Sequence, residues 1–161
     1  MKTHTLPALL IALLIPAAFT ASADDKAEQI AVIVNRSSAL TDLSSAELVK
    51  YFKVQKTKIS DGSKLTLVAQ DVGRPERNAV LSKVYAMSED EYSRYFLQAT
   101  FTGAVAAAPK ALPNGGAVIK FVEETPGAIS YVRASEATEA VKVVKIDGKA
   151  PGDAGYPLVM K

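Results

Sequence analysis

The sequence predicts an α/β fold: a single three-layer domain with a mixed, mostly parallel sheet and helices on its faces. Three observations lead to this prediction. Continuous apolar runs rich in β-branched residues are typical of strands that are covered on both faces. These runs alternate along the chain with segments that carry helix-start signals, which is the order that parallel α/β sheets require. The 161-residue chain also has room for one such domain after an N-terminal segment.

The first part of the domain contains two predicted strands with a helix between them. Ile30–Val34 and Leu65–Ala69 are the two apolar runs. Ser44 and Glu47 have the spacing of a capping box, in which each side chain bonds the backbone N–H of the other residue. We therefore expect a helix from this point to about Phe52.

Two further helices follow the second strand. Pro75 suits the first position of a helix, because its missing N–H is not needed there, and this helix is expected to run to about Ala86. Ser88 and Glu91 form a second capping box. They predict a helix that extends to about Thr100.

The last third of the chain completes the sheet. Asn114 can cap another helix, and Thr125-Pro126-Gly127 ends it. Ala128–Val132 and Val141–Ile146 are the remaining predicted strands, and Leu158–Met160 is a candidate for a short edge strand. Crossovers of these lengths predict parallel neighbours. The last two strands can pair differently, which would make the sheet mixed.

Residues 1–23 have the pattern of a cleaved secretory signal peptide. Lys2 supplies the positive charge, the stretch from Leu6 to Ile15 is apolar, and Ala21-Ser22-Ala23 is a small-residue cleavage site. The apolar stretch is shorter than the roughly 20 residues that a membrane span needs. We therefore expect a signal peptide over 1–23, an α/β domain over 24–161, a periplasmic location and no membrane anchor after cleavage.

The composition excludes several kinds of site. The only histidine is His4, inside the predicted signal peptide, and the chain contains no cysteine. The mature chain therefore lacks the residues of Ser-His-Asp and Cys-His catalytic sites and of His/Cys metal sites. No enzymatic activity, metal or cofactor is expected. The net charge of +2 does not indicate the clustered basic face of a nucleic-acid-binding protein.

Ligands of α/β sheets usually lie beyond the carboxyl ends of strands, near helix N-termini. The loops Asn35–Asp42 and Gln70–Arg74 have such positions. Free N–H groups and the guanidinium groups of Arg74 and Arg77 favour an anion there. Glu76 favours the alternative, a capped turn without a ligand, because it already supplies negative charge. The candidate ligand-binding residues are Gln70, Asp71, Gly73, Arg74, Arg77, Asn78, Ser37 and Ser38.

Several segments resemble, in the same order, the phosphate-type substrate-binding proteins of bacterial ABC transporters, in the periplasmic-binding-protein superfamily. The most specific is Thr125–Val132 (TPGAISYV), which is similar to the family's TPGAIGYV segment. The others are Ile30–Asn35 (IAVIVN), Leu43–Phe52 (LSSAELVKYF), Tyr51–Gly62, Phe101–Gly103 (FTG) and Asn114–Val118 (NGGAV). The resemblance implies the second lobe alone of a two-lobed, type II periplasmic binding protein.

The resemblance also implies a changed anion site. In the phosphate binders an R-x-D-G-S-G-T segment opens the helix after this strand, and its Arg, Ser and Thr contact the phosphate. Gln70 stands at the Arg position, Arg74 at the Ser position and Glu76 at the Thr position, whereas Gly73 is retained. A carboxylate therefore stands in the anion's place.

We expect an exported, non-enzymatic protein that resembles a phosphate ABC transporter substrate-binding component with a degenerate anion site. The implied partners are phosphate or another small oxyanion, and a transporter permease or another periplasmic protein. The alternative is a periplasmic protein-interaction module that has kept the scaffold and lost small-ligand binding.

Overall fold

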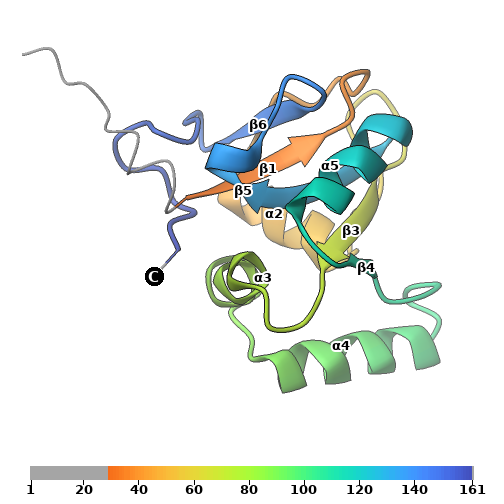
Figure 1. Cartoon of the computed structure of the whole chain (residues 1–161). Coiled ribbons are helices and arrows are strands. Elements are labelled where there is room, and N and C mark those ends of the chain that lie inside the picture. The colour runs from red at the N-terminus through yellow and green to blue at the C-terminus, as the bar shows by residue number, and fades with distance from the viewer. Residues whose placement is uncertain (1–28, 161) are drawn as a thin grey trace, which may run out of the picture.

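A computed structural model describes residues 29–160, so the predicted signal peptide lies outside the described residues. The fold is the predicted α/β domain, a mixed, mostly parallel six-stranded sheet with helices on both faces (Figure 1). The strand order is β2-β6-β1-β5-β3-β4. The strands are β1 (Ile30–Val34), β2 (Asp42–Leu43), β3 (Thr66–Gln70), β4 (Lys110–Leu112), β5 (Ala128–Arg133) and β6 (Lys142–Ile146).

The direction of β1 determines which loops can meet. It pairs antiparallel with both of its neighbours, β5 and β6, whereas the other pairs of neighbouring strands are parallel. β1 therefore runs against the other strands of the sheet. The sequence predicted that the first two long strands, β1 and β3, are parallel neighbours. Instead β5 lies between them, and because β5 is antiparallel to β1 and parallel to β3, β1 and β3 run in opposite directions. The carboxyl end of β1 is consequently at the opposite end of the sheet from the carboxyl ends of β3, β4 and β5.

The helices begin where the local signals predicted. Both capping boxes are present, with Ser44 and Ser88 each accepting from the N–H of the glutamate three residues on. Asn114 caps the last helix, with its Oδ1 2.9 Å from the N–H of Ala117. The elements are α2 (Ser45–Phe52), α3 (Pro75–Val80), the π-helix η1 (Leu81–Tyr85), α4 (Glu89–Phe101), α5 (Gly115–Glu124) and the 3₁₀-helix η2 (Ala134–Glu136).

The helix expected from Pro75 to Ala86 is not one regular α-helix. It changes at Leu81 into the π-helix η1, which closes at Ala86 in a left-handed conformation with φ 51°. This turn places the hydroxyl of Tyr85 2.8 Å from the carbonyl oxygen of Phe52. A π-turn inserts one residue into the helix, and hydrophobic spacing alone does not reveal such an insertion.

The strand edges also differ from the sequence prediction. β2 and β4 were not predicted because they contain two and three residues. The candidate edge strand over Leu158–Met160 is wrong, since Val159 forms only an isolated bridge with Gln29. The segment still supports the sheet, because the N–H of Ile30 donates to the carbonyl of Leu158.

The sheet separates two apolar clusters. Side chains alternate between the faces of a strand, so Val32 belongs to one cluster and Ile33 to the other. The larger cluster packs beneath α2, α3, η1 and α4, and the smaller one beneath α5. Figure 1 shows α4 as the helix farthest from the sheet. Among residues 29–160 no helix is long and apolar enough to span a membrane.

Asn35 fixes the end of β1 to the end of α5. It is buried, and its Nδ2 donates to the carbonyl oxygens of Val122 and Glu123 at 2.8 Å each. Its Oδ1 accepts from the N–H of Ser37 at 2.9 Å. The amide thus satisfies carbonyl groups that the last turn of a helix leaves without partners.

The variant Asn35→Asp should destabilise the protein by about 2 kcal/mol. The carboxylate keeps the acceptor for Ser37 but replaces the donor with an oxygen that faces two carbonyl oxygens. Urea unfolding at pH 7 measures this loss. Asn78→Asp, at an exposed position on α3, is the control and should change the free energy of unfolding little. Equal stability of Asn35→Asp and the parent would contradict this role.

Candidate functional site

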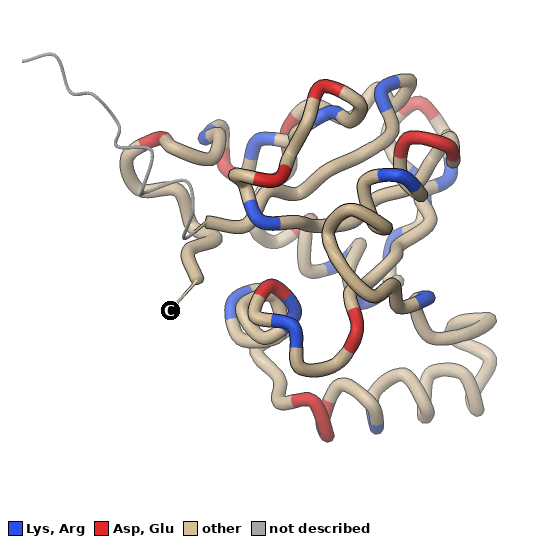
Figure 2. Tube along the Cα trace, in the orientation of Figure 1, with Lys and Arg blue, Asp and Glu red and all other residues tan. Residues whose placement is uncertain are grey.

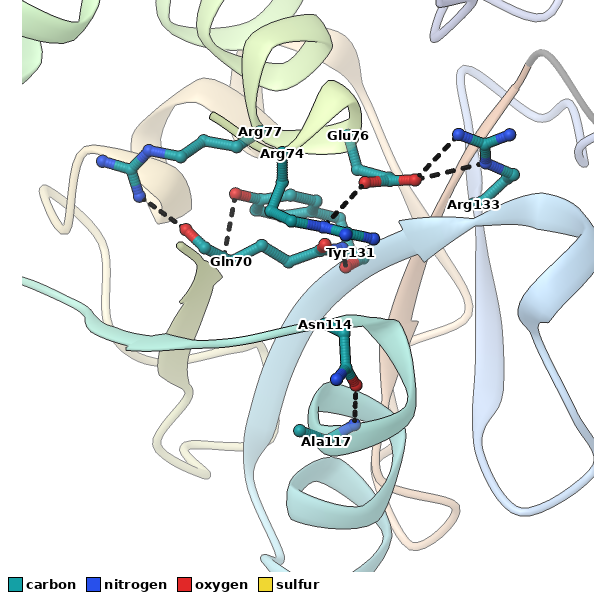
Figure 3. A network of polar contacts seen from close by, with 8 residues as sticks. All are labelled: Gln70, Arg74, Glu76, Arg77, Asn114, Ala117, Tyr131 and Arg133. Carbon is teal, nitrogen blue, oxygen red and sulfur yellow. Dashed lines mark hydrogen bonds and ion pairs between the residues drawn. The ribbon is translucent and has the colours of Figure 1, made fainter. Parts of the chain in front are cut away.

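The candidate site lies where the carboxyl ends of β3 and β5 meet the start of α3 (Figure 3). β3 ends at Gln70, β5 ends at Arg133, and Arg74 is the N-cap of α3. The parallel pairing of β3 and β5 brings these ends to the same edge of the sheet. This is the edge at which ligands of α/β folds commonly bind.

Gln70 is the last residue of β3 and not part of the polar loop that the sequence predicted. It is fully buried, with 0% of its surface exposed. Its Nε2 donates to the carbonyl of Tyr131 at 3.1 Å, and its backbone N–H donates to the Tyr131 hydroxyl at 3.2 Å. Its Oε1 has no hydrogen-bond partner among the described residues. Gln70 therefore ties β3 to β5 and retains one unused buried acceptor.

Glu76 places a buried carboxylate at the centre of the site. Only 1% of its side chain is exposed. Its Oε1 accepts from Nε and Nη2 of Arg133 at 3.2 and 3.0 Å. Nε of Arg74 lies 3.6 Å from its Oε2, close enough for an ion pair (Figure 3). Because Glu76 is the second residue of α3, the positive end of that helix also favours its charge.

Arg77 points away from the loop, toward α4. Its Nε donates to Glu89 Oε2 at 2.8 Å, and its Nη1 donates to the carbonyl of Gln70 at 2.8 Å. Its guanidinium carbon lies 4.6 Å from the centre of the Tyr92 ring. The hydrogen-bonded Glu89 carboxylate raises the pKa of Arg77 above its usual range, so the positive charge of Arg77 is paired with a carboxylate of the same chain.

The structure does not bring all the predicted ligand-binding residues together. Gly73, with φ +85°, Asp71 and Asn78 are exposed around the start of α3. Ser37 and Ser38 follow β1 and therefore lie at the other end of the sheet. There they line a hollow of about 220 Å³ with residues of the 63–65 and 126–127 segments.

A second carboxylate occupies the start of α5. Glu136, in η2, packs so closely against Gly115 that a Cβ at that position would overlap its Oε2. Gly115 is the first residue of α5, so this carboxylate faces the positive end of a helix. The starts of α3 and α5 thus both carry a carboxylate from the chain itself.

Sequence reasoning missed the part played by Arg133. The residue follows the segment most similar to the phosphate binders, but nothing in the local pattern connects it with Glu76, which is 57 positions away. One signal in the sequence indicated a nearby cation. It is the carboxylate of Glu76 at a helix start, which needs a cationic partner if it is buried. No group of His, Cys, Asp and Glu side chains in residues 29–160 could hold a metal ion.

The phenol of Tyr131 makes the site sensitive to high pH. Burial raises the pKa of Tyr131 to about 12, from an ordinary value of 10. The folded state then holds this proton more tightly than the unfolded state does. The stability that it contributes is complete below pH 10 and is lost as the pH rises through 12.

Between pH 10 and 12 the variant Tyr131→Phe should lose roughly 2–3 kcal/mol less of its free energy of unfolding than the parent does. Urea unfolding at pH 8, 10, 11 and 12 gives the slopes for parent and variant. Burial also raises the pKa values of Tyr85 and Tyr92, so part of the loss should remain in the variant. Equal slopes would show that Tyr131 titrates normally.

Comparison with known proteins gives structural matches only. Neither the protein-family comparison nor the search of curated proteins returns a match. A phosphate ABC transporter substrate-binding protein from Clostridium perfringens, solved with bound phosphate, matches with a TM-score of 0.63 and 18% identity. An ABC-type phosphate transport receptor from Vibrio cholerae matches with a TM-score of 0.62 and 16% identity. PstS from Borrelia burgdorferi matches with a TM-score of 0.64 and 12% identity.

These matches cover most of this chain but only part of the matched proteins. They extend over 76%, 76% and 83% of this chain, and over 46%, 48% and 55% of the three matched chains, in the same order. The chain therefore spans about half the length of the structures that it matches. The likeness shows that this chain has the fold of a lobe of such proteins.

Proposed function

We propose that this protein is an exported, non-enzymatic binding protein of the solute-binding type whose oxyanion site is degenerate. One observation supports this proposal most directly. Glu76, at the helix start that corresponds to the phosphate-contacting segment of the phosphate binders, is buried and paired with Arg133 and Arg74. The chain's own carboxylate thus satisfies the cations that would otherwise attract a free oxyanion.

The energetics favour this internal pairing. Removing one partner of a buried ion pair costs several kcal/mol, because the other charge is left uncompensated in a poorly solvated place. A phosphate would have to displace Glu76 from Arg133, and the displaced carboxylate would repel it. We therefore expect phosphate or another small oxyanion to bind weakly, at millimolar concentrations. The partial exposure of Arg133 and Arg74, 33% and 37%, still leaves a route for such an anion.

Export, the periplasmic location and a transport partner are parts of the same proposal. The pattern of residues 1–23 supports cleavage and export. Two of the matched structures, a substrate-binding protein of a phosphate ABC transporter and a phosphate transport receptor, support a binding role and a permease as partner. They equally favour a protein without catalytic activity.

A second candidate function is a periplasmic protein-interaction module. The specific observation is the exposed apolar surface of α4, where Leu97 and Phe101 are 72% and 92% exposed. They are four residues apart and so lie on one face of the helix. The stretch between Arg94 and Lys110 contains no charged residue, as Figure 2 shows. Exposed apolar patches of this kind mark contact surfaces.

The variant Glu76→Gln should convert the degenerate site into a better anion site. The amide fills the same space without the negative charge, which frees Arg133 and Arg74 to attract an anion. We expect phosphate to bind at least about tenfold more tightly to the variant than to the parent. Titration calorimetry measures both affinities. Glu123→Gln, at an exposed residue of α5, is the control and should leave the affinity unchanged.

Two results would contradict the proposal. Micromolar binding of phosphate by the parent would show that the oxyanion site is intact. Absence of phosphate binding by both parent and variant at 10 mM would show that these arginines do not form an anion site and would favour the interaction module. Because Glu76→Gln leaves charges without a partner, thermal unfolding with and without phosphate should accompany the titration, and phosphate should stabilise the folded variant.

The double variant Leu97→Ser/Phe101→Ser tests the interaction module. If α4 is a contact surface, the parent should retain a partner from periplasmic extract, and the double variant should lose about nine-tenths or more of it. The exposed Val72, on the loop before α3, provides the control variant Val72→Ser. Equal capture by all three proteins would exclude this face of α4 as the contact surface.

A further inference from the structure

A hollow with a mainly apolar lining lies at the amino end of β3, away from the candidate oxyanion site. Its volume is about 460 Å³, within the range of small-molecule sites. It lies between the 64–68 segment at the start of β3 and the 104–110 segment that leads from α4 into β4. β4 pairs only with residues 68–70 of β3, so the preceding part of the β3 edge is left beside the pocket.

The lining of this pocket is mainly apolar. The larger apolar residues of the lining come from four separate parts of the chain and are Val54, Leu65, Val68, Val105 and Phe121. The alanines at positions 104 and 106–108 line the wall that α4 leads into and are themselves exposed. A pocket with such a surface suits an aliphatic group, which gains about 0.8 kcal/mol for each CH₂ removed from water.

The wall formed by residues 104–109 is anchored. Val105 is buried, with 8% of its surface exposed, and it belongs to the larger apolar cluster. Its N–H donates to the carbonyl of Ala99 at 3.1 Å, which holds the segment to the end of α4. The fold itself therefore holds this wall of the pocket in place, as is usual for small-molecule sites.

The charged groups of the lining have one sign. Lys64 and Lys110 both line the pocket, and its lining includes no aspartate or glutamate. The Nζ of Lys110 lies 5.3 Å from the centre of the Phe121 ring, so the ammonium group sits over an aromatic face. Both lysines are exposed, which places their charges where the head group of a ligand would remain in contact with water.

We propose that this pocket binds an aliphatic carboxylate, with the alkyl chain against the apolar lining and the carboxylate beside Lys64 and Lys110. The volume of the pocket, its mainly apolar lining and its two positive charges all favour a ligand with an alkyl chain and one negative head group. A cationic amphiphile would meet two ammonium groups. A small inorganic anion would leave the apolar surface unfilled. The inference does not depend on the oxyanion site, because Glu76 and Arg133 lie at the other end of β3.

Titration calorimetry of the purified protein with decanoate tests the inference. We expect saturable binding of one decanoate per chain in the micromolar range. Decyltrimethylammonium, which has the same chain and the opposite charge, should bind at least about tenfold more weakly. Inorganic phosphate should not compete with decanoate, which separates this site from the oxyanion site. Absence of saturable decanoate binding up to 1 mM would overturn the proposal.

Charge-reversal variants locate the site. Lys64→Glu/Lys110→Glu should weaken decanoate binding by about tenfold or more, because the carboxylate would then face like charges. Lys120→Glu, at an exposed residue of α5 outside the pocket lining, is the matched control and should bind as the parent does. Unchanged binding by the double variant, or equal weakening by the control, would overturn the assignment to this pocket. Circular dichroism and thermal unfolding of each variant establish that it is folded.

Discussion

A buried carboxylate is stable only when cations lie beside it. At the carboxyl edge of the sheet, the burial of Glu76 therefore determines where the neighbouring arginines lie. With 1% of its side chain exposed, Glu76 pairs with Arg133 at the end of β5 and with Arg74 at the N-cap of α3. Arg77 is directed elsewhere, to Glu89 on α4. The arrangement connects β5, α3 and α4 around one edge. It also engages the guanidinium groups of all three arginines with carboxylates of the fold itself.

The reversed direction of β1 gives the two ends of the sheet different properties. At the carboxyl ends of β3 and β5 the surface is polar and occupied by internal ion pairs. At the amino end of β3 the chain instead leaves hollows lined by apolar and basic residues, and the loop after β1 lies there as well. Ser37 lies just after β1 and Gln70 is the last residue of β3, two strands for which the sequence predicted the same direction. The structure places the two residues at opposite ends of the domain.

The sequence predicts features that depend on a few neighbouring residues and misses those that depend on distant ones. The capping boxes of Ser44 and Ser88 and the apolar run of β1 were correct, because capping and strand burial leave local patterns. The predicted direction of β1 was wrong, because that direction is determined by pairing with strands about a hundred residues away. The Glu76–Arg133 pair was not predicted for the same reason, because the two residues are 57 positions apart. The sequence did show the carboxylate of Glu76 at that helix start.

The pairing of β1 also has a consequence for when the domain can fold. Its partners are β5 and β6, so Ile30 lies opposite Arg133 and Val32 opposite Val144. As the chain is synthesised from its N-terminus, the first strand has no partner until the last third has been made. Contacts of such long sequence separation slow folding, because the loop between them must close first. A sheet whose central strand finds its partners last keeps the nascent polypeptide unfolded for longer.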